Sequence, residues 1–431
     1  TYPRYALDVA FFRVYAPDGT PLKPEHYFSW DTGGAQPNEA VFAVGHPRST
    51  SRLKTVSQFK YMRAHELPNR LETLRKRRNL LEQYVKAHPD SADRYGLRTL
   101  YFTIQNSVKS YRGQLRGLRD PYLLARRGAA LQALQDSIQA VDSLRQAYGN
   151  VLGEIDRLQQ SKTVMADKAG AFEVFSNLKL GSRILVRALH AYYYDFLRTR
   201  GAPPDRIESI RKDALKVTDW PPGLEKKFLA VQFKEIRDAY GASHPTVQRL
   251  FKKRTPEELA AHLVETSALM DSTSFVKLLK EGYRRSKDTS VPVIEALAPM
   301  FLNVNRQMQD IRRRERRLNA RLSRARFAVY GSRFPPDATG GLRLSDGRVK
   351  SYPYNGTTAP PFTNFYGLYD RYYSQNEGAW SLPPRWINAV DSLDLGTPLN
   401  LVSTVDISGG SSGSPLLNKD LELVGVVFDS N

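Results

Sequence analysis

The sequence predicts an α+β protein in which two β segments enclose a long helical insert. Residues 1–52 contain the short apolar runs "LDVAFFRVY" and "AVFAVGHP", and residues 331–431 contain "LNLVSTVDI" and "LELVGVVF". Residues that favour turns separate these runs, as they separate strands. Residues 53–330 are instead rich in Leu, Ala, Arg, Glu and Gln, which favour helices. The order therefore indicates one β-built unit that is divided by a helical insertion.

The insert carries the periodic pattern of amphipathic helices. Between residues 131 and 158, apolar side chains recur in alternating steps of three and four, which places them on one stripe of a long helix. Comparable stretches flank this one, so we expect the stripe to pack against another helix rather than to form a partner-binding zipper. Prolines at 203–204, 221–222 and 245 predict separate helices. The stripe consists of Leu131, Leu134, Ile138, Val141, Leu144, Tyr148, Val151, Ile155 and Leu158.

The composition is that of an ordinary globular protein, and 431 residues suffice for two or three domains. The absence of cysteine excludes disulfides, thiolate metal sites and a cysteine nucleophile from these residues. No run of about 18 apolar residues occurs, so we expect no membrane span. The sequence begins inside a predicted strand, with neither an initiator Met nor a signal peptide. We therefore expect it to be a piece of a longer protein.

The chain is strongly basic, with 64 Lys and Arg against 44 Asp and Glu. Such a charge can attract nucleic acid, anionic lipid or acidic peptides. Much of it lies in stretches such as residues 310–326, where arginines fall on every side of the expected helix, as on a solvated surface. The interleaved aromatic and basic residues of a known nucleic-acid module are missing. A basic helical nucleic-acid-binding protein stays an alternative, but we expect no nucleic-acid partner.

A serine motif stands near the end of the sequence. The stretch "GSSGSP" fits the frame GxSGxP at Gly410, Ser412, Gly413 and Pro415. In serine proteases built from two β-barrels, a loop with this frame presents the nucleophile, which is Ser412 here. The N–H groups of Gly410 and Ser412 would then form an oxyanion hole. A flexible surface loop is the alternative, but the stretch runs directly into the apolar segment "SPLLNKDLELVGVVFD".

A serine nucleophile needs a base, usually histidine, and a carboxylate that orients it. The first two histidines lie in a turn and beside a proline, and the others lie in the helical region, so none has a convincing context for the base. In the chymotrypsin order the histidine precedes the aspartate and the serine. We therefore expect the base upstream of residue 1. The seven histidines are His26, His46, His65, His88, His190, His244 and His262.

Both β regions resemble a family of bacterial dipeptidyl peptidases, known as dipeptidyl-peptidase seven and eleven. The segments that carry the resemblance are "YPRYALDVAFFRVYAPDGTPLKP", "VFAVGHPRSTSRL", "FPPDATGGLRLSDGRVKSYPY", "LPPRW" and "STVDISGGSSGSPLLNKDLELVGVVFDSN". The helical part is similar chiefly around "IQNSVKSYRGQLRGL". The resemblance implies a chymotrypsin-like double β-barrel with an α-helical cap domain, residues 53–330, inserted between the barrels. Residues 1–52 would end the first barrel, and residues 331–431 would form part of the second.

The resemblance also implies roles for individual residues. Ser412 matches the nucleophile, and Asp8 matches the aspartate that orients the base; without the resemblance Asp8 would be an ordinary strand-edge carboxylate. The family's histidine lies in a His-His-Cys motif that this sequence does not contain, so we expect the chain alone to be inactive. Asp429 and Asn106 match residues that hold the substrate's α-ammonium, a buried cation that needs acceptors. A turn aspartate and an exposed helix residue are the alternatives.

Ser430 matches the residue at the base of the pocket for the side chain just before the cleaved bond. Family members with Gly there resemble enzymes that take hydrophobic side chains, and those with Arg take Asp or Glu, as charge pairing predicts. Ser430 is small and neutral. We therefore expect a preference for hydrophobic or uncharged side chains over acidic ones.

The whole pattern predicts a serine dipeptidyl aminopeptidase, which releases dipeptides from the free N-terminus of oligopeptides. The helical domain would leave room for only two residues beyond the scissile bond. We expect no metal ion and no organic cofactor. The resemblance further implies an exported bacterial enzyme, periplasmic or at the cell surface, and a homodimer. A two-barrel serine endopeptidase and a catalytically inactive homologue stay alternatives.

Overall fold

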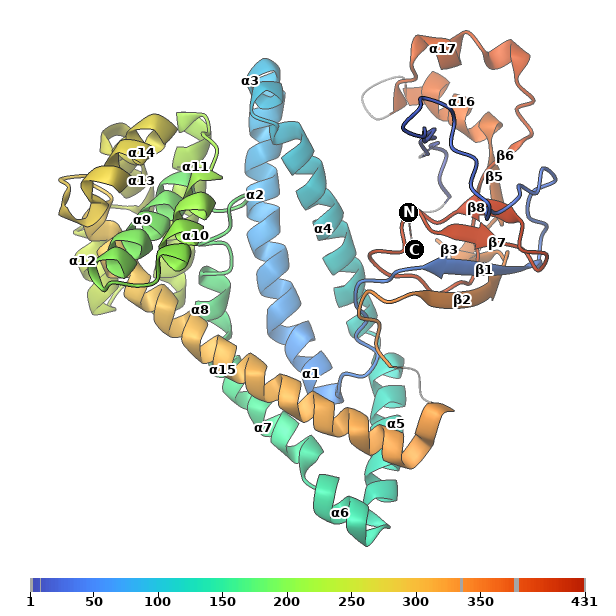
Figure 1. The fold of residues 1–431 in the computed structure, drawn as a ribbon, viewed down its shortest axis with the longest axis horizontal. Coiled ribbons are helices and arrows are strands. Elements are labelled where there is room, and N and C mark those ends of the chain that lie inside the picture. Colours follow the sequence, from blue (N-terminus) through green and yellow to red (C-terminus); the bar gives the residue numbers. More distant parts are fainter. Residues whose placement is uncertain (1–2, 8, 334–335, 376–379, 430–431) are drawn as a thin grey trace. The chain divides into compact units, whose positions relative to one another are not determined.

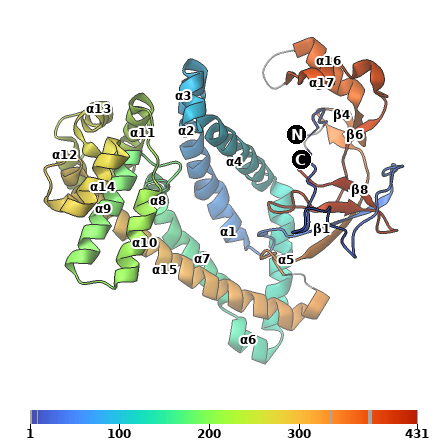
Figure 2. The same cartoon turned by 45° about the horizontal axis from the view of Figure 1, so that its top comes forward.

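The computed structural model describes residues 3–7, 9–333, 336–375 and 380–429. The chain divides into a β unit, made of Thr1–Leu53 and Pro335–Asn431, and a helical unit, made of Lys54–Phe334. Figures 1 and 2 show the ribbon from two directions. The mixture of helices and sheets confirms the predicted α+β class. Each unit is described separately below.

The first half of the helical unit is held together by apolar contacts among α1, α2 and α4. Leu67, Leu71 and Leu81 of α2 and Ile104 of α4 are almost completely buried in one cluster, and α2 and α4 lie side by side (Figures 1 and 2). The elements are α1 (Val56–Tyr61), the π-helical turn η1 (Met62–Glu66), α2 (Leu67–Ala87), α3 (Pro89–Arg94), α4 (Leu97–Leu118), α5 (Pro121–Gln139), α6 (Asp142–Tyr148), α7 (Val151–Val164) and α8 (Ala166–Ala171).

Several helices of the second half begin at prolines, and three of these prolines are ones from which the sequence predicts separate helices. Pro204, Pro222, Pro245 and Pro256 each occupy the first turn of a helix, where the missing N–H costs nothing. Their apolar faces meet in the largest core cluster of the described residues. The helices are α9 (Arg183–Thr199), α10 (Pro204–Leu215), α11 (Pro222–Tyr240), α12 (Pro245–Phe251), α13 (Pro256–Thr266), α14 (Ser272–Glu281) and α15 (Val291–Tyr330).

The apolar stripe of residues 131–158 packs on another helix, as predicted, but the prediction of one long helix is wrong. Its residues belong to α5, α6 and α7, and Ile138, Val151 and Ile155 are fully buried against α15. The chain breaks at Gly149, where an added β-carbon would lie 2.5 Å from the carbonyl oxygen of Arg145. The close approach of the backbone at this glycine therefore allows the turn between α6 and α7.

The main sheet of the β unit joins segments from both ends of the sequence. Its four antiparallel strands follow the order β2-β1-β7-β8. Inward-facing Val41, Ala43 and Leu416 are buried with Val349 and Val427 in a separate core. The strands are β1 (Ala40–Gly45), β2 (Arg343–Arg348), β7 (Pro415–Leu417) and β8 (Leu423–Val426).

Two small sheets and two helices complete the β unit, and one of these sheets contains a tight hairpin turn. Asp346 and Gly347 form an Asp-Gly pair, which favours a hairpin turn, but both residues lie within β2 and pair with Phe42 and Val41 of β1. The tight turn occurs at Asn355 and Gly356, which both have positive φ, as a two-residue hairpin requires. The elements are β3 (Tyr352–Tyr354), β4 (Thr357–Ala359), β5 (Phe362–Asn364), α16 (Phe365–Gln375), α17 (Pro384–Ile387) and β6 (Pro398–Leu401).

The predicted strand over residues 7–15 is not formed in the described part of that segment. In this part an isolated bridge joins Tyr15 to Pro21. Adjacent side chains such as those of Phe11 and Phe12 are both exposed, so neither face of the segment is buried. Without a partner strand, the alternating apolar side chains of this segment have no sheet face on which to be buried. None of the three sheets in the described residues closes into a barrel, so the double β-barrel is not confirmed. Among these residues, no helix combines the length and apolar character needed to span a membrane.

Candidate active site

The serine motif forms a loop that leads into β7 of the main sheet. Two consecutive backbone turns build it: the N–H of Ser411 donates to Ser408 O at 2.9 Å, and the N–H of Ser414 donates to Ser411 O at 3.0 Å. The N–H of Gly413 donates to Val427 O at 2.7 Å, and the N–H of Val427 returns a bond to Ser414 O at 2.9 Å. These reciprocal bonds hold the loop against the residue that follows β8.

The three serines of the loop have different surroundings. Ser411 and Ser414 are buried, with 5% and 7% of their surface exposed. A β-carbon placed on Gly45 would lie 2.1 Å from the hydroxyl oxygen of Ser414, which shows how tightly that side chain packs against β1. Ser412 is exposed, and its hydroxyl donates a long bond of 3.5 Å to Phe428 O. Of these three hydroxyls, that of Ser412 is therefore the one accessible to a substrate.

Gly410 is required by the path of the backbone. Its φ is +105°, and a β-carbon there would lie 2.7 Å from the carbonyl oxygen of His46 and 2.9 Å from the nitrogen of Arg48. The same segment is tied to the loop because the N–H of Arg48 donates to Gly409 O at 2.9 Å. Within the described residues, the N–H groups of Gly410 and Ser412 have no acceptor. They are therefore available to an oxyanion.

Neither histidine of the β unit is hydrogen-bonded to Ser412. The backbone of His46 lies against Gly410, but its ring Nδ1 lies 3.3 Å from the carbonyl oxygen of Gly340. His26 is exposed in the N-terminal segment. The upstream position of the base stays a prediction. Asp8 and Ser430, predicted for the catalytic and specificity sites, lie outside the described residues.

Asp429 lies on the same segment as Phe428, the residue that accepts the Ser412 bond. An oxygen of its carboxylate lies 3.1 Å from Nη1 of Arg4, and the Arg4 guanidinium stacks 5.0 Å from the centroid of the Phe428 ring. The carbonyl of Arg4 is fixed in turn, since it accepts bonds from Thr363 Oγ1 at 2.7 Å and Asn400 Nδ2 at 3.0 Å. Arg4 was missed at the sequence level, because no spacing links it to a residue 425 positions away.

A groove of about 720 Å³ in the β unit includes this ion pair in its lining. Arg4, Phe428 and Asp429 contribute, together with Val405 and Ile407 from the segment before the serine loop. Charged, aromatic and aliphatic side chains thus line one cavity of the size that small peptides occupy. Asn106, the other residue predicted for the ammonium, is exposed on α4 of the helical unit. The β unit therefore brings together Ser412, Gly410 and Asp429, but not Asn106.

An exposed serine on a glycine-shaped loop is one part of a serine-peptidase site, which also needs a base for the serine. Comparison with known proteins identifies the family. The Peptidase S46 model matches residues 1–431, so the chain belongs to the peptidase S46 family. The described residues hold no group of three or more His, Cys, Asp or Glu arranged to bind a metal ion.

The chain is similar to two kinds of curated relatives. Dipeptidyl-peptidase 7 of Porphyromonas endodontalis is 23% identical over 460 residues, which cover 100% of this chain and 55% of the relative. The Asp/Glu-specific dipeptidyl-peptidase of Capnocytophaga gingivalis is 23% identical over 470 residues, which cover 99% of this chain and 63% of the relative. The chain thus spans less than two thirds of the length of these relatives.

A solved structure shares the fold. The crystal structure of Porphyromonas endodontalis DPP11 in complex with the dipeptide Arg-Glu superposes with a TM-score of 0.76 at 16% sequence identity. The match covers 96% of this chain and 61% of that one. At this identity the likeness concerns the fold of the aligned part.

Proposed function

We propose that this chain is part of a serine dipeptidyl aminopeptidase, which removes dipeptides from the free N-terminus of oligopeptides. The observation that carries the proposal is the placement of the exposed Ser412 hydroxyl beside the segment that contains Phe428 and Asp429. One group would attack the peptide, and the other would hold its terminal ammonium. The names of the relatives, which are dipeptidyl-peptidases, agree with this reading.

In the proposed reaction, Ser412 Oγ attacks the carbonyl carbon of the second peptide bond and passes its proton to a histidine. We propose that this histidine belongs to another part of the full-length protein and that Asp8 orients its ring. The N–H groups of Gly410 and Ser412 would donate to the oxyanion of the tetrahedral intermediate. The histidine then gives the proton to the leaving amine, and water releases the dipeptide from the acyl-enzyme. No metal or organic cofactor takes part in this scheme.

The limit to dipeptides requires an anchor for the substrate's ammonium. Asp429 supplies a carboxylate whose position is fixed by Arg4, and a charge-assisted hydrogen bond from the ammonium would offset part of its desolvation. Asn106 would add an acceptor from the helical unit, which we propose to act as the cap. The chymotrypsin-like double barrel, an exported location and a homodimer belong to the same proposal, and a nucleic-acid partner does not.

The preferred side chain before the cleaved bond is proposed to be hydrophobic or uncharged. The relatives include enzymes named Asp/Glu-specific and enzymes without that label, so membership of the family leaves the preference open. The sequence "FDSN" offers a small neutral residue at 430. A buried acidic side chain would need a cation there, since an unpaired charge is expensive to desolvate.

The test uses the full-length protein that contains this chain and two matched peptides, one with a free N-terminus and one with an N-acetyl group. We expect dipeptide release from the free peptide alone, and loss of turnover by a factor on the order of 10⁴ to 10⁶ in Ser412→Ala. Ser411→Ala and Ser414→Ala, the matched controls, should keep a folded and at least partly active enzyme. Cleavage of the acetylated peptide would favour the endopeptidase alternative. Equal loss in Ser414→Ala would contradict the choice of nucleophile.

A further inference from the structure

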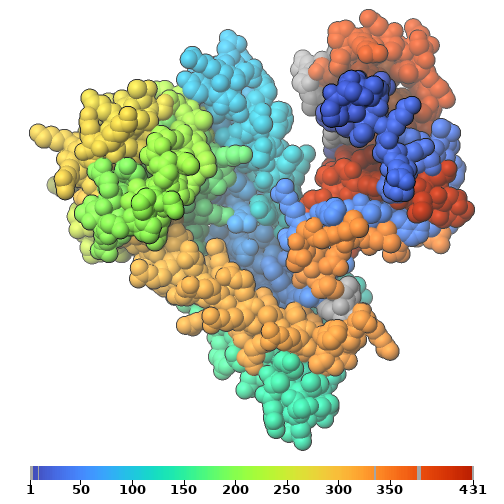
Figure 3. Space-filling view, in the orientation of Figure 1, coloured from blue at the N-terminus to red at the C-terminus, as the bar shows by residue number. Residues whose placement is uncertain are grey.

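A second cavity, of about 490 Å³, lies wholly within the helical unit. Residues of α1, η1, α2, α7, α8 and α15 line it, and the surface is hollowed between α2 and α15 (Figure 3). Five of its lining residues are apolar and buried: Met62, Phe172, Phe301, Val304 and Met308. The cavity has the size of a small-molecule site. The peptidase reaction proposed above does not use it.

Some of the charges at this cavity satisfy one another. The carboxylate of Glu315 accepts bonds from Gln58 Nε2 at 2.9 Å, Gln159 Nε2 at 2.8 Å and Lys162 Nζ at 3.2 Å. Arg70 Nε donates to Glu173 Oε1 at 2.5 Å. These groups form the structural frame of the site, because buried charges require such partners.

Other donors at the cavity have no such partner. The Tyr61 residue is 7% exposed as a whole, and no hydrogen bond joins its hydroxyl to another described residue. The hydroxyl oxygen itself is not fully buried, so it can donate to a ligand in the cavity. The Lys54 ammonium contacts Met62 Sδ at 3.0 Å, which is a weak acceptor, and no carboxylate of the described residues pairs with it. Arg312 and Arg316 also line the cavity without a carboxylate partner among these residues.

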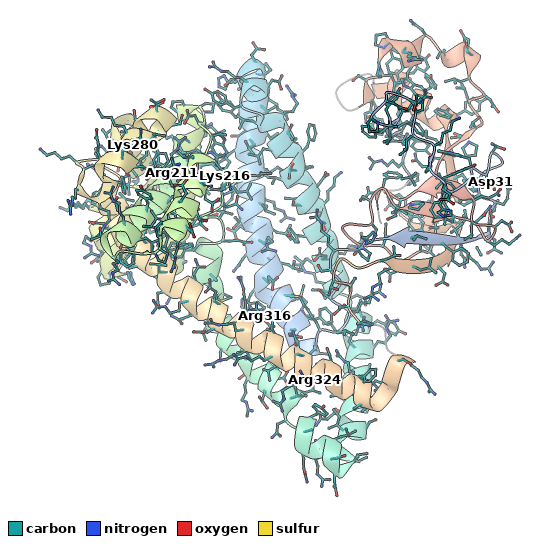
Figure 4. All side chains as sticks on the ribbon, viewed as in Figure 1. Asp31, Arg211, Lys216, Lys280, Arg316 and Arg324 are labelled. Atoms are coloured by element: carbon teal, nitrogen blue, oxygen red, sulfur yellow. The ribbon has the colours of Figure 1, made fainter. Side chains whose placement is uncertain are left out.

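The unpaired donors lie on two elements that meet at the cavity. Lys54 lies two residues before α1, and Tyr61 is the last residue of α1, directly before the π-helical turn η1. Turns of this kind occur often at functional sites. Arg312 and Arg316 are one turn apart on α15, and Figure 4 shows Arg316 in the middle part of that helix. Against these three cations, Glu66 is the one cavity carboxylate that lacks a cationic partner in the described part of the chain. The site therefore has an excess of positive charge.

We propose that this cavity binds a small organic carboxylate. Lys54, Arg312 and the Tyr61 hydroxyl would donate to the carboxylate, since lysine, arginine and tyrosine supply donors of suitable geometry. The apolar body of the ligand would pack against Phe301 and Met308. Such a ligand would accept bonds from the Tyr61 hydroxyl and the half-buried Lys54 ammonium together.

The test is a calorimetric titration of the full chain with three probes: N-acetylphenylalanine, its uncharged amide, and inorganic phosphate. We expect saturable binding of the acid, and at least tenfold weaker binding of the amide and of phosphate. The amide lacks the carboxylate, and phosphate lacks the apolar body. Equal affinities for the acid and the amide, or no saturation by about 10 mM acid, would overturn the proposal. Phosphate binding as tight as that of the acid would refute the organic ligand.

Variants separate binding at this cavity from binding elsewhere. Lys54→Met and Arg312→Gln should each lower the affinity for N-acetylphenylalanine by about tenfold. Tyr61→Phe, which keeps the ring, should lower this affinity by a smaller factor. Arg324→Gln is the matched control, since Arg324 lies on the same helix but outside the cavity (Figure 4). Arg312 is exposed, so its replacement leaves the fold intact even if Lys54→Met does not. The same loss in Arg324→Gln as in Arg312→Gln would contradict the assigned site.

Discussion

Replacement of Gly410 by alanine tests the geometry of the serine loop most directly. The structure offers a graded set of three glycines within five residues: Gly409, Gly410 and Gly413. Gly410 combines a φ of +105° with backbone atoms 2.7 and 2.9 Å from the position of a β-carbon. Gly413 has a φ of +85° but open space around it, and Gly409 has an ordinary φ and open space. The three substitutions therefore add one methyl group to sites of decreasing constraint.

The expected magnitudes follow from these two constraints. A positive φ costs a residue other than glycine about 1 to 3 kcal/mol. Overpacking against fixed atoms costs about 1 to 3 kcal/mol more. Gly410→Ala carries both costs, Gly413→Ala carries the first, and Gly409→Ala should fall within about 0.5 kcal/mol of the parent. Because Gly410 itself is exposed, the backbone at this residue should relieve the strain of Gly410→Ala by moving, which displaces the oxyanion donors.

The assay measures kcat for a dipeptidyl chromogenic substrate, together with the unfolding temperature, in the full-length protein. Displacement of one oxyanion donor lowers kcat by about 10² to 10³, so we expect that loss in Gly410→Ala, a smaller loss in Gly413→Ala and no change in Gly409→Ala. A normal unfolding temperature would show that the effect is local. If Gly409→Ala and Gly410→Ala lower kcat equally, or if Gly410→Ala keeps the parent kcat, the assignment of Gly410 is wrong.

Three further predictions concern the substrate groove and the helical unit. Ser430→Arg should shift selectivity toward Asp and Glu before the cleaved bond by at least tenfold in kcat/KM, and an unchanged profile would show that the pocket lies elsewhere. Arg4→Met should raise KM for free N-termini more than it lowers kcat, since Asp429 loses the cation that positions it; a pure loss of kcat would contradict that role. Burial opposes the ionisation of Glu315, but Lys162 and its amide partners hold the pKa of Glu315 below its ordinary value. That stabilisation is present above the ordinary pKa and is lost as the pH falls through the folded pKa. Glu315→Gln should therefore lower the free energy of unfolding by about 2 to 3 kcal/mol near neutral pH, with a difference that shrinks in acid; a difference independent of pH would refute the ion pair.

Elements with a strong local signal could be predicted from the sequence. The run "AVFAVG" alternates in burial along β1, and "LVGV" forms β8. The prolines that begin α10, α11 and α12 act through their own fixed φ, which needs no knowledge of the fold. The break between α6 and α7 was missed, because helical periodicity continues across Gly149 and the turn depends on how α5 and α7 pack on α15.

The candidate site likewise contains features that a local motif predicts and features that depend on long-range contacts. Ser412 and Gly410 could be predicted because the motif is local, and the backbone conformation at Gly410 is a property of glycine. The burial that separates Ser412 from Ser411 and Ser414 depends on β1, from the other end of the sequence. The pairing of Arg4 with Asp429 likewise depends on long-range folding. The spacing of residues along the sequence does not predict contacts between segments that lie so far apart.

A long helical insertion separates the two sequence segments of the β unit, and a side chain at the junction holds these segments together. The carboxylate of Asp337, which follows the insert, accepts bonds from Thr50 Oγ1 at 2.5 Å, from the N–H of Arg52 at 2.8 Å and from the N–H of Leu53 at 3.2 Å. The points where the chain leaves and re-enters the β unit are thus joined by a single side chain. Three charge-assisted bonds at this place offset part of the entropy of closing a loop as long as the insert. Residues 46–48, which shape the backbone at Gly410, lie just before this junction. The insertion contributes no residue to the serine loop, but the segment that contacts Gly410 leads directly into the junction that closes the insertion.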